Sequence, residues 1–174
     1  VGVWAGALTQ AQIQSVMEST SYATIPASVK STLGAEEIAN GDFATGDFTG
    51  WSGNTSFDGS NGCVITDDGA CRLRTTGSSI HINQNTLVNG NFYKLTFDIT
   101  DITTGTMKFV STGDGEVVTQ YTTTGTKTLY FNATGTYAYF QRNSGATDVT
   151  FDNISIKEVT NDLVGYWGLD ATAT

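Results

Sequence analysis

Hydrophobic and polar residues follow two different periods along this chain, and the change falls near Glu36. Before it, four apolar residues recur at the spacing of one helix face: Leu8, Ile13, Val16 and Met17. Thr9 stands just ahead of most of them, where its side-chain oxygen suits an N-cap, so the pattern predicts a helix over 8–20. A second short helix is predicted over 25–34, because Pro26 suits a helix start and Gly34 a helix stop.

From Glu36 onward apolar residues alternate with polar ones, which is the period of a β-strand. Strands separated by Gly, Asn and Asp turns are predicted at Glu37–Phe43, Cys63–Thr66, Cys71–Thr75, Ser79–Asn83, Phe92–Thr100, Thr106–Val110, Val117–Tyr121, Lys127–Asn132, Tyr137–Arg142 and Thr147–Val159. So many short strands favour an all-β fold. The expected architecture is a jelly-roll β-sandwich of two antiparallel sheets with a short helical N-terminal segment.

The last predicted strand changes parity midway. Val149 and Phe151 occupy odd positions, whereas Ile154 and Ile156 occupy even ones. One extra residue at Asp152–Asn153 would turn all four side chains to one face, which is what a β-bulge does. The sequence therefore predicts a bulge at this point.

The run ANGDFATGDFTGWSGNT, residues 39–55, sets large aromatic side chains among residues that favour turns. Asn-Gly and Gly-Asp steps suit tight turns, because glycine reaches positive φ without steric cost. Aromatic side chains gain most from burial. We expect Phe43 and Trp51 to anchor this loop in the core, with the glycines making its corners.

Charge and composition exclude several classes of function. With 17 Asp and Glu against 8 Lys and Arg, the formal net charge is −9, so nucleic acid is not an expected partner. No apolar run approaches the ~20 residues that cross a bilayer, so membrane insertion is not expected either. The chain begins at Val1 with no visible signal peptide, and we expect it to be processed or cut from something longer.

Two cysteines, Cys63 and Cys71, flank the segment VITDDGA. If this is a hairpin centred on Asp67, the two residues face each other across the strands. A cross-strand disulfide and two free thiols are both compatible with that placement. One pair of cysteines says little about the redox compartment.

Several predicted strands direct polar and aromatic side chains away from their apolar face. If these strands are neighbours, one sheet face carries His81, Asn83, Tyr130, Tyr137, Tyr139 and Gln141, and Tyr121 joins them. A pyranose stacks its C–H face on an aromatic ring while polar neighbours bond its hydroxyl groups. The set therefore predicts a sugar-binding face. The alternative is a tyrosine-rich face that is covered by a neighbouring domain or simply exposed.

Catalytic sites are hard to build from this sequence. A single histidine, His81, removes most His-based metal centres, since zinc takes several N or S ligands. No nucleophile signature surrounds it, and the carboxylates that glycoside hydrolysis needs lie mostly in predicted turns. We therefore expect a protein that is not an enzyme.

Three segments resemble a known family. NGDFATGDFTGW near the start, VTFDNISIKEV at the end and LVNGNFYKLTFDIT between them are similar to segments of carbohydrate-binding-module-like jelly rolls of the CenC type. The resemblance covers about residues 36–159 and is more specific for the fold than for sugar binding. It also implies a structural Ca²⁺ where the first and last strands meet, at the matching positions Glu37, Asn40, Asp42 and Asp152. The alternative is that Asp42 and Asp152 bond turn amides.

The flanks carry a second resemblance. VGVWAGALTQAQIQSVM resembles the final strand and short helix of a laminin-G-type, concanavalin-like sandwich, and NDLVGYWGLDATAT resembles the opening strand of another. This implies three parts. Residues 1–34 end a preceding laminin-G-like domain and form a helical linker, 35–159 form the carbohydrate-binding-module-like sandwich, and 160–174 link to a following domain. Such arrays are frequent in phage structural proteins and bacterial surface proteins.

Together these features predict a non-catalytic structural or adhesion module of a larger assembly, such as a phage virion fibre or decoration protein, with weak glycan recognition. The expected partners are other virion or surface subunits in a homo-oligomer and a cell-surface polysaccharide. The expected location is a virion or extracellular, and the expected cofactor is structural Ca²⁺. Two alternatives stay open: a carbohydrate-binding module of a secreted bacterial enzyme or surface protein, and a purely architectural spacer.

Overall fold

The computed structural model describes residues 2–4, 8–19, 32–111, 117–161 and 163–166. Its elements follow in the order β1 (Gly2–Trp4), α1 (Gln10–Met17), β2 (Thr32–Glu36), β3 (Ser52–Gly53), β4 (Gly62–Ile65), β5 (Cys71–Thr75), β6 (His81–Asn85), β7 (Phe92–Thr104), β8 (Met107–Val110), β9 (Val117–Tyr121), β10 (Gly125–Asn132), β11 (Tyr137–Arg142), β12 (Thr147–Asn161) and β13 (Leu163–Tyr166). Strands thus dominate the part after Glu36, as the alternation predicts.

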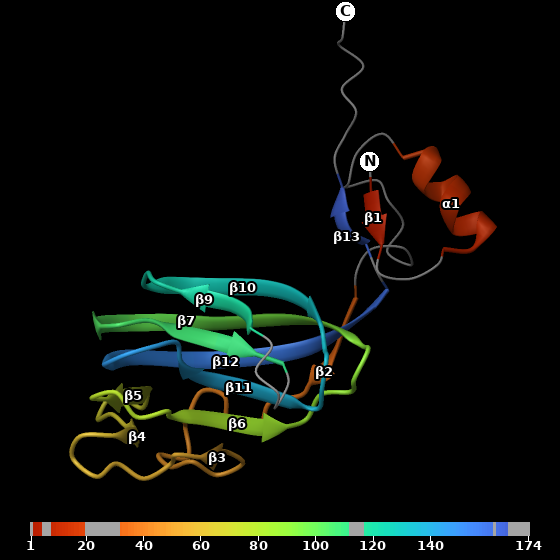
Figure 1. Ribbon diagram of the computed structural model, residues 1–174. Coiled ribbons are helices and arrows are strands. Elements are labelled where there is room, and N and C mark those ends of the chain that lie inside the picture. The colour runs from red at the N-terminus through yellow and green to blue at the C-terminus, as the bar shows by residue number, and fades with distance from the viewer. Residues whose placement is uncertain (1, 5–7, 20–31, 112–116, 162, 167–174) are drawn as a thin grey trace, which may run out of the picture. The chain divides into compact units, whose positions relative to one another are not determined.

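Two antiparallel sheets make up the body of residues 36–157. The six-stranded sheet has the order β10-β7-β12-β5-β4, with β2 also paired to β12, and the five-stranded sheet has the order β3-β6-β11-β8-β9. In Figure 1, β7 and β12 lie side by side in one sheet, while β6 and β11 lie side by side in the other. This is the jelly-roll β-sandwich that the sequence predicts.

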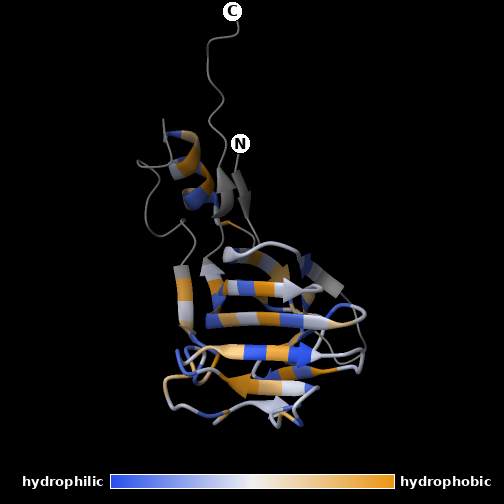
Figure 2. Cartoon of the chain, turned by 90° about the vertical axis from the view of Figure 1, so that its left-hand side faces the viewer, coloured by the Kyte–Doolittle hydropathy of each residue, from blue (hydrophilic) through white to orange (hydrophobic). Residues whose placement is uncertain are grey.

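Hydrophobic and hydrophilic residues alternate along several of these strands, as the colours in Figure 2 show. In β7, the apolar side chains Tyr93, Leu95, Phe97 and Ile99 are each at most 1% exposed. The polar residues between them point to the outer face of the sheet. The period-two pattern therefore identified the buried face of this strand correctly.

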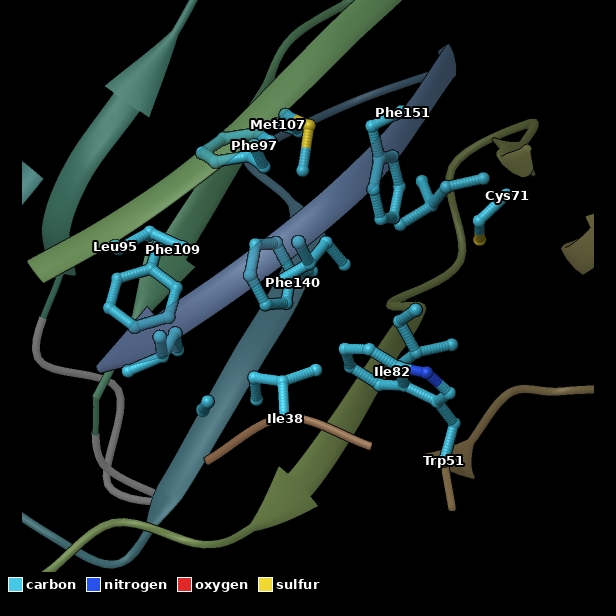
Figure 3. Packing of buried hydrophobic residues seen from close by; sticks show 14 of the residues in the cluster. Ile38, Trp51, Cys71, Ile82, Leu95, Phe97, Met107, Phe109, Phe140 and Phe151 are labelled. Carbon is cyan, nitrogen blue, oxygen red and sulfur yellow. The ribbon is translucent and has the colours of Figure 1, made fainter. Parts of the chain in front are cut away.

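Phenylalanine rings from both sheets fill the space between them (Figure 3). The ring of Phe140 on β11 lies 5.5 Å from that of Phe97 on β7 and 5.8 Å from that of Phe151 on β12. Aromatic pairs of this kind add about 0.5–1.5 kcal/mol beyond the burial of their area. Phe140 therefore joins the two sheets at the centre of the core.

The predicted strand Glu37–Phe43 is wrong, because β2 ends at Glu36 and the following residues form a loop. Asn40 has φ 49° and Phe43 has φ 48°, and this left-handed backbone interrupts a strand. A Cβ added to Gly41 would stand 2.0 Å from the carbonyl oxygen of Ile154 on β12. Glycine at this position lets the loop lie directly against β12.

The aromatic residues of this loop are core anchors, as expected. Phe43 is 0% exposed and Trp51 is 6% exposed, and their ring centroids lie 5.6 Å apart. The indole Nε1 of Trp51 donates a hydrogen bond to the carbonyl of Asn40 at 3.0 Å. Burial and this bond together fix the loop to the sandwich.

The bulge predicted in the last strand is present. Val149, Phe151, Ile154 and Ile156 are all buried although their positions change parity. Asn153 takes up the extra residue with φ 54°, a conformation that asparagine tolerates better than most residues. The bulge thus keeps both halves of β12 facing the core.

Strand boundaries differ from the prediction at β6. The strand begins at His81 and runs to Asn85, two residues later than expected. Gln84 occupies a buried position because its side chain exchanges two hydrogen bonds with the backbone of Ala39, at 3.0 and 2.6 Å. A glutamine at a core position hid this part of the strand from the hydropathy pattern. The two-residue strand β3 was not predicted.

The β4–β5 hairpin is centred one residue later than predicted. Its register pairs Cys63 with Leu73 and Ile65 with Cys71, so the two cysteines are diagonal neighbours rather than opposite each other. Both are buried free thiols in the structure. Burial raises the pKa of the Cys71 thiol well above its ordinary value.

Residues 1–35 and 158–174 group as a second unit, in which β1 pairs antiparallel with β13.

The predicted N-cap of α1 is confirmed. The Thr9 hydroxyl accepts a hydrogen bond from the backbone amide of Gln12 at 3.3 Å, and Gln12 Oε1 accepts one from the backbone amide of Thr9 at 2.8 Å. The second predicted helix falls mostly on 20–31, outside the described residues, but Gly34 lies within β2 rather than at a helix stop. That the flanks belong to laminin-G-like domains stays a prediction.

Within the described part of the chain, no helix is long and apolar enough to cross a membrane.

Candidate functional site

The outer face of the five-stranded sheet gathers most of the predicted sugar-binding residues. In the β6–β11 register, Tyr139 is paired with Asn83 and Gln141 with His81. Directly paired residues point to the same side of a sheet, so these side chains form one surface. We call it the polar face, and it consists of His81, Asn83, Asn85, Lys108, Gln120, Tyr137, Tyr139 and Gln141.

Three rings form a continuous row on the polar face. The ring centroids of Tyr137 and Tyr139 lie 5.6 Å apart, and those of Tyr139 and His81 lie 5.1 Å apart in an edge-on arrangement. Tyr137 is 37% exposed, while Tyr139 and His81 are half-buried. Rings that hold each other in place present a ready apolar surface for a flat ligand.

Strand β3 explains how His81 packs so closely on the backbone. A Cβ added to Gly53 would stand 2.6 Å from the His81 carbonyl oxygen and 2.9 Å from its Cδ2 atom, so glycine leaves the room for this ring. Burial lowers the pKa of His81 below its ordinary value. The imidazole is therefore neutral at pH 7 and offers one donor and one acceptor.

A carboxamide in the middle of the polar face has no hydrogen-bond partner among the described side chains. Asn83 is only 7% exposed, yet nothing in the described part of the chain bonds its side chain. Its oxygen and nitrogen atoms are not among the enclosed side-chain atoms that lack a partner, so they are open to water or to a ligand hydroxyl group.

Sequence reasoning missed three residues of this surface: Asn85, Lys108 and Gln120. Met107 and Phe109 are fully buried, so Lys108 between them faces outward. It is paired with Gln141 on one side and Gln120 on the other. The alternation in β8 signalled the direction of Lys108. Nothing in the sequence signalled that β8 lies between β11 and β9.

Tyr130 lies on the other sheet, so the expectation of one shared face is wrong for this residue. It belongs to β10, where it is paired with Lys94 of β7, and its ring stacks on Phe92 with centroids 6.2 Å apart. The Nζ atom of Lys94 lies 5.9 Å from the centroid of the tyrosine ring. The alternation gives the direction of a side chain but not the sheet to which its strand belongs.

Tyr121 points into the core rather than to the polar face. It is 9% exposed, and its ring centroid lies 4.9 Å from that of Phe97 in an edge-on contact. Burial raises the pKa of its hydroxyl far above the ordinary value. Tyr121 is therefore a packing residue in this structure.

Two of the residues expected at a calcium site organise the loop between β2 and β3, residues 37–51, which we call the opening loop. The Asn40 side-chain amide donates to the carbonyls of Asp47 and Thr49, at 3.0 and 3.2 Å. Asp42 Oδ1 accepts from the Ala44 amide at 3.2 Å. Asp42 thus makes the turn bond that the sequence offered as the alternative to a cation, and Asn40 ties the loop through its own side chain.

The other two expected ligands lie near β12. Asp152 Oδ1 accepts from the Asn153 amide at 2.7 Å. Burial raises the pKa of Asp152, and the carboxylates of Asp42 and Asp98 raise it further. The backbone amide of Glu37 donates to the Ile156 carbonyl at 2.9 Å.

The carboxylate of Glu36, the residue before the predicted ligand Glu37, bonds to β12. It accepts a hydrogen bond from the backbone amide of Ile156 at 2.7 Å. Among the described residues, no three His, Cys, Asp or Glu side chains converge as metal ligands. The calcium site at Glu37, Asn40, Asp42 and Asp152 stays a prediction.

Comparisons with known proteins show relatives in fold but not in sequence. No protein-family model and no curated protein matches the chain. The K3 cleaved adhesin domain of Lys-gingipain from Porphyromonas gingivalis w83 is 15% identical over 74% of this chain and 99% of that chain, with a TM-score of 0.50. The CBM22-1 xylan-binding domain of Paenibacillus barcinonensis Xyn10C is 11% identical over 75% and 99%, with a TM-score of 0.45.

A third similar structure is the enzymatically active domain of tailspike protein 4 from bacteriophage CBA120. It is 17% identical over 71% of this chain, with a TM-score of 0.45. This chain spans 21% of that chain's length. Of the three, the adhesin domain reaches a TM-score of 0.50, and at 15% identity that likeness shows a shared fold and nothing beyond it.

Proposed function

We propose that this protein is a non-catalytic module that binds a glycan on the polar face. The observation that carries the proposal is the row of rings from Tyr137 through Tyr139 to His81, set beside hydrogen-bonding side chains. A partly exposed aromatic row next to amide side chains fits a ligand with an apolar face and a polar edge. Sugars have this combination.

The roles of the side chains follow from their places. Tyr137 and Tyr139 offer ring surface to the C–H face of a sugar. The Asn83 carboxamide, which has no partner among the described side chains, and the amide of Gln141 offer donors and acceptors to hydroxyl groups. Neutral His81 supplies one further donor and one acceptor at the end of the row.

Binding at one such site is expected to be weak. A millimolar Kd corresponds to about 4 kcal/mol, and display of several copies in an assembly raises the effective affinity through avidity. The finer proposal is therefore a homo-oligomeric virion or surface protein that meets a cell-surface polysaccharide. It is supported by the resemblance of the flanking segments to parts of phage and bacterial surface proteins.

We also propose that a Ca²⁺ ion joins the opening loop to β12 at Asp152, with Asp42 as the second carboxylate. Mutual repulsion of these carboxylates, which contributes to the raised pKa of Asp152, is what a cation would relieve.

The test of the glycan proposal uses tyrosine variants on the two sheets. Tyr139→Ala is expected to abolish binding of the multimeric protein to a glycan array, with a small loss of stability, because its ring is half-buried. Tyr130→Ala is the matched control, since Tyr130 is an exposed tyrosine on the opposite sheet and its loss should leave array binding unchanged.

The opposite result supports the architectural alternative. If the wild-type protein binds no glycan while Tyr139→Ala disrupts assembly or lowers stability by several kcal/mol, the polar face is an interface covered by another subunit.

A further inference from the structure

The five strands of the sheet that bears the polar face contain no carboxylate. Their segments are Ser52–Gly53, His81–Asn85, Met107–Val110, Val117–Tyr121 and Tyr137–Arg142, and they include two basic residues, Lys108 and Arg142. The chain as a whole carries a net charge of −9. Strands of the six-stranded sheet, by contrast, carry both signs: six acids, Glu36, Asp98, Asp101, Asp148, Asp152 and Glu158, and five basic residues, Arg72, Arg74, Lys94, Lys127 and Lys157. The charge of the five-stranded sheet is thus opposite to that of the protein.

Among the basic residues that the structure describes, Lys108 differs in that no described residue pairs with its ammonium group. Of the eight Lys and Arg residues, Lys30 lies outside the described part and seven lie within it. Six of these seven make a recorded contact: Arg72 and Arg74 with Asp148, Lys157 with Glu36, Lys94 with the Tyr130 ring, Lys127 with Thr123 and Thr124, and Arg142 with the Gly145 carbonyl. Within the described residues, the ammonium group of Lys108 has neither an acid nor a hydrogen-bond acceptor.

The position of Lys108 places that free charge among the ligand-binding groups. It is half-buried and is paired directly with Gln141, which in turn is paired with His81. Gln120, on its other side, is held by a hydrogen bond from Asn143 Nδ2 at 3.0 Å. One row across the sheet therefore runs from Gln120 through Lys108 and Gln141 to His81.

We infer that the glycan bound by the polar face is anionic, with a carboxylate or sulfate group placed at Lys108. This inference rests on the proposed glycan binding and specifies its ligand class. A lysine that is partly desolvated and unpaired gains a charge-assisted hydrogen bond from an anion, and such bonds are about twice as strong as neutral ones. Neutral sugars would leave this ammonium group unpaired.

The test uses oligosaccharides in matched pairs: oligogalacturonate with its methyl ester, and chondroitin sulfate with desulfated, carboxyl-reduced chondroitin. The wild-type protein is expected to bind the acidic member of at least one pair about tenfold more tightly, which corresponds to about 1.4 kcal/mol. Lys108→Met should remove that preference without lowering the melting temperature. Raising the salt concentration should weaken acidic binding in the wild-type protein but not in Lys108→Met.

The matched control is Lys94→Met, which removes the same charge from the opposite sheet. It should keep the preference for the acidic member, because the loss of net charge alone does not alter the polar face. If Lys94→Met and Lys108→Met lower acidic binding equally, the effect is one of net charge and the inference is overturned.

Two further outcomes separate this inference from the proposed function. If the wild-type protein binds both members of every pair equally and Tyr139→Ala binds neither, the ligand is not anionic and the proposed glycan binding stands. If the wild-type protein binds none of the oligosaccharides and Tyr139→Ala behaves in the same way, both the inference and the proposed function are overturned.

Discussion

A few residues determine where the opening loop lies on the sandwich. Gly41 allows the loop backbone to touch β12, and the amide of Ile154 donates to its carbonyl at 2.9 Å. Asn40 and Phe43 on either side adopt positive φ, so the chain turns sharply around this contact. Phe43 still reaches the core with no exposed surface. The contact at Gly41 is therefore the point on which the whole loop depends.

Replacing Gly41 tests this dependence. Gly41→Ala should lower the free energy of unfolding by about 3 kcal/mol, because the added Cβ would collide with the backbone carbonyl of Ile154. Gly46→Ala is the control: Gly46 has φ 71°, but nothing lies within 4 Å of an added Cβ, so about 1 kcal/mol is expected. Urea unfolding of both variants measures the difference, and equal losses would show that the close contact does not matter.

At the scale of elements, the bulge in β12 keeps both halves of the strand facing the core. It also places the Asp152 carboxylate where burial and two other carboxylates disfavour its charged form. The pKa of Asp152 is raised by burial and by Asp42 and Asp98. A carboxyl group whose pKa is higher in the folded than in the unfolded state favours folding fully below the unfolded pKa, near 3.8. That contribution is lost as the pH rises through the folded pKa, so the charged Asp152 destabilises the protein at pH 7.

Asp152→Asn is therefore expected to raise the melting temperature at pH 7 in the absence of Ca²⁺. The asparagine Oδ1 still accepts from the Asn153 amide, so the turn is retained. At about pH 3, where the native carboxyl group is protonated in both states, the two proteins should melt together. A variant that is less stable than the wild-type protein at pH 7 would contradict this account of Asp152.

Calcium provides a separate test of the same element. If Ca²⁺ binds here, adding CaCl₂ at matched ionic strength should raise the melting temperature of the wild-type protein and leave that of Asp152→Asn unchanged. An equal response of the two proteins, or none, would remove the proposed ion and leave Asp152 as a turn-capping residue.

Elements with a regular alternation could be predicted from the sequence, and those held by polar or backbone contacts could not. The strands around Phe97 and Phe140, and the bulge at Asp152–Asn153, follow directly from which positions are apolar. The loop at 37–43 could not be predicted as a loop, because its shape comes from the contact of Gly41 with a strand far away in the sequence. Strand order was equally hidden, which is why Tyr130 was grouped with the wrong sheet.

The candidate site was predicted in part for the same reason. Alternation correctly placed His81, Asn83, Tyr137, Tyr139 and Gln141 on one outward face once β6 and β11 are neighbours. The neighbour on the other side, β8, brings Lys108 to that face, and this pairing has no signature in the local sequence. Whether a lysine has a partner is likewise a property of the folded chain.

On the scale of the whole molecule, the sandwich separates two kinds of surface. The strands of the six-stranded sheet carry acidic side chains as well as basic ones, whereas those of the five-stranded sheet carry no carboxylate and present rings, amides and Lys108. Rings also occur on the six-stranded sheet, where Tyr130 stacks on Phe92, so the two faces are distinguishable by experiment. The central claim is that this face, and not the opposite one, binds the ligand.

The most direct measurement of that claim is an NMR titration of the ¹⁵N-labelled protein with the oligosaccharide that binds best on the array. The account predicts that the largest amide shifts fall on His81–Asn85, Met107–Val110 and Tyr137–Arg142, the three central strands of the five-stranded sheet. Largest shifts around Tyr130 and Phe92 on the six-stranded sheet, or no shifts at saturating ligand, would contradict it.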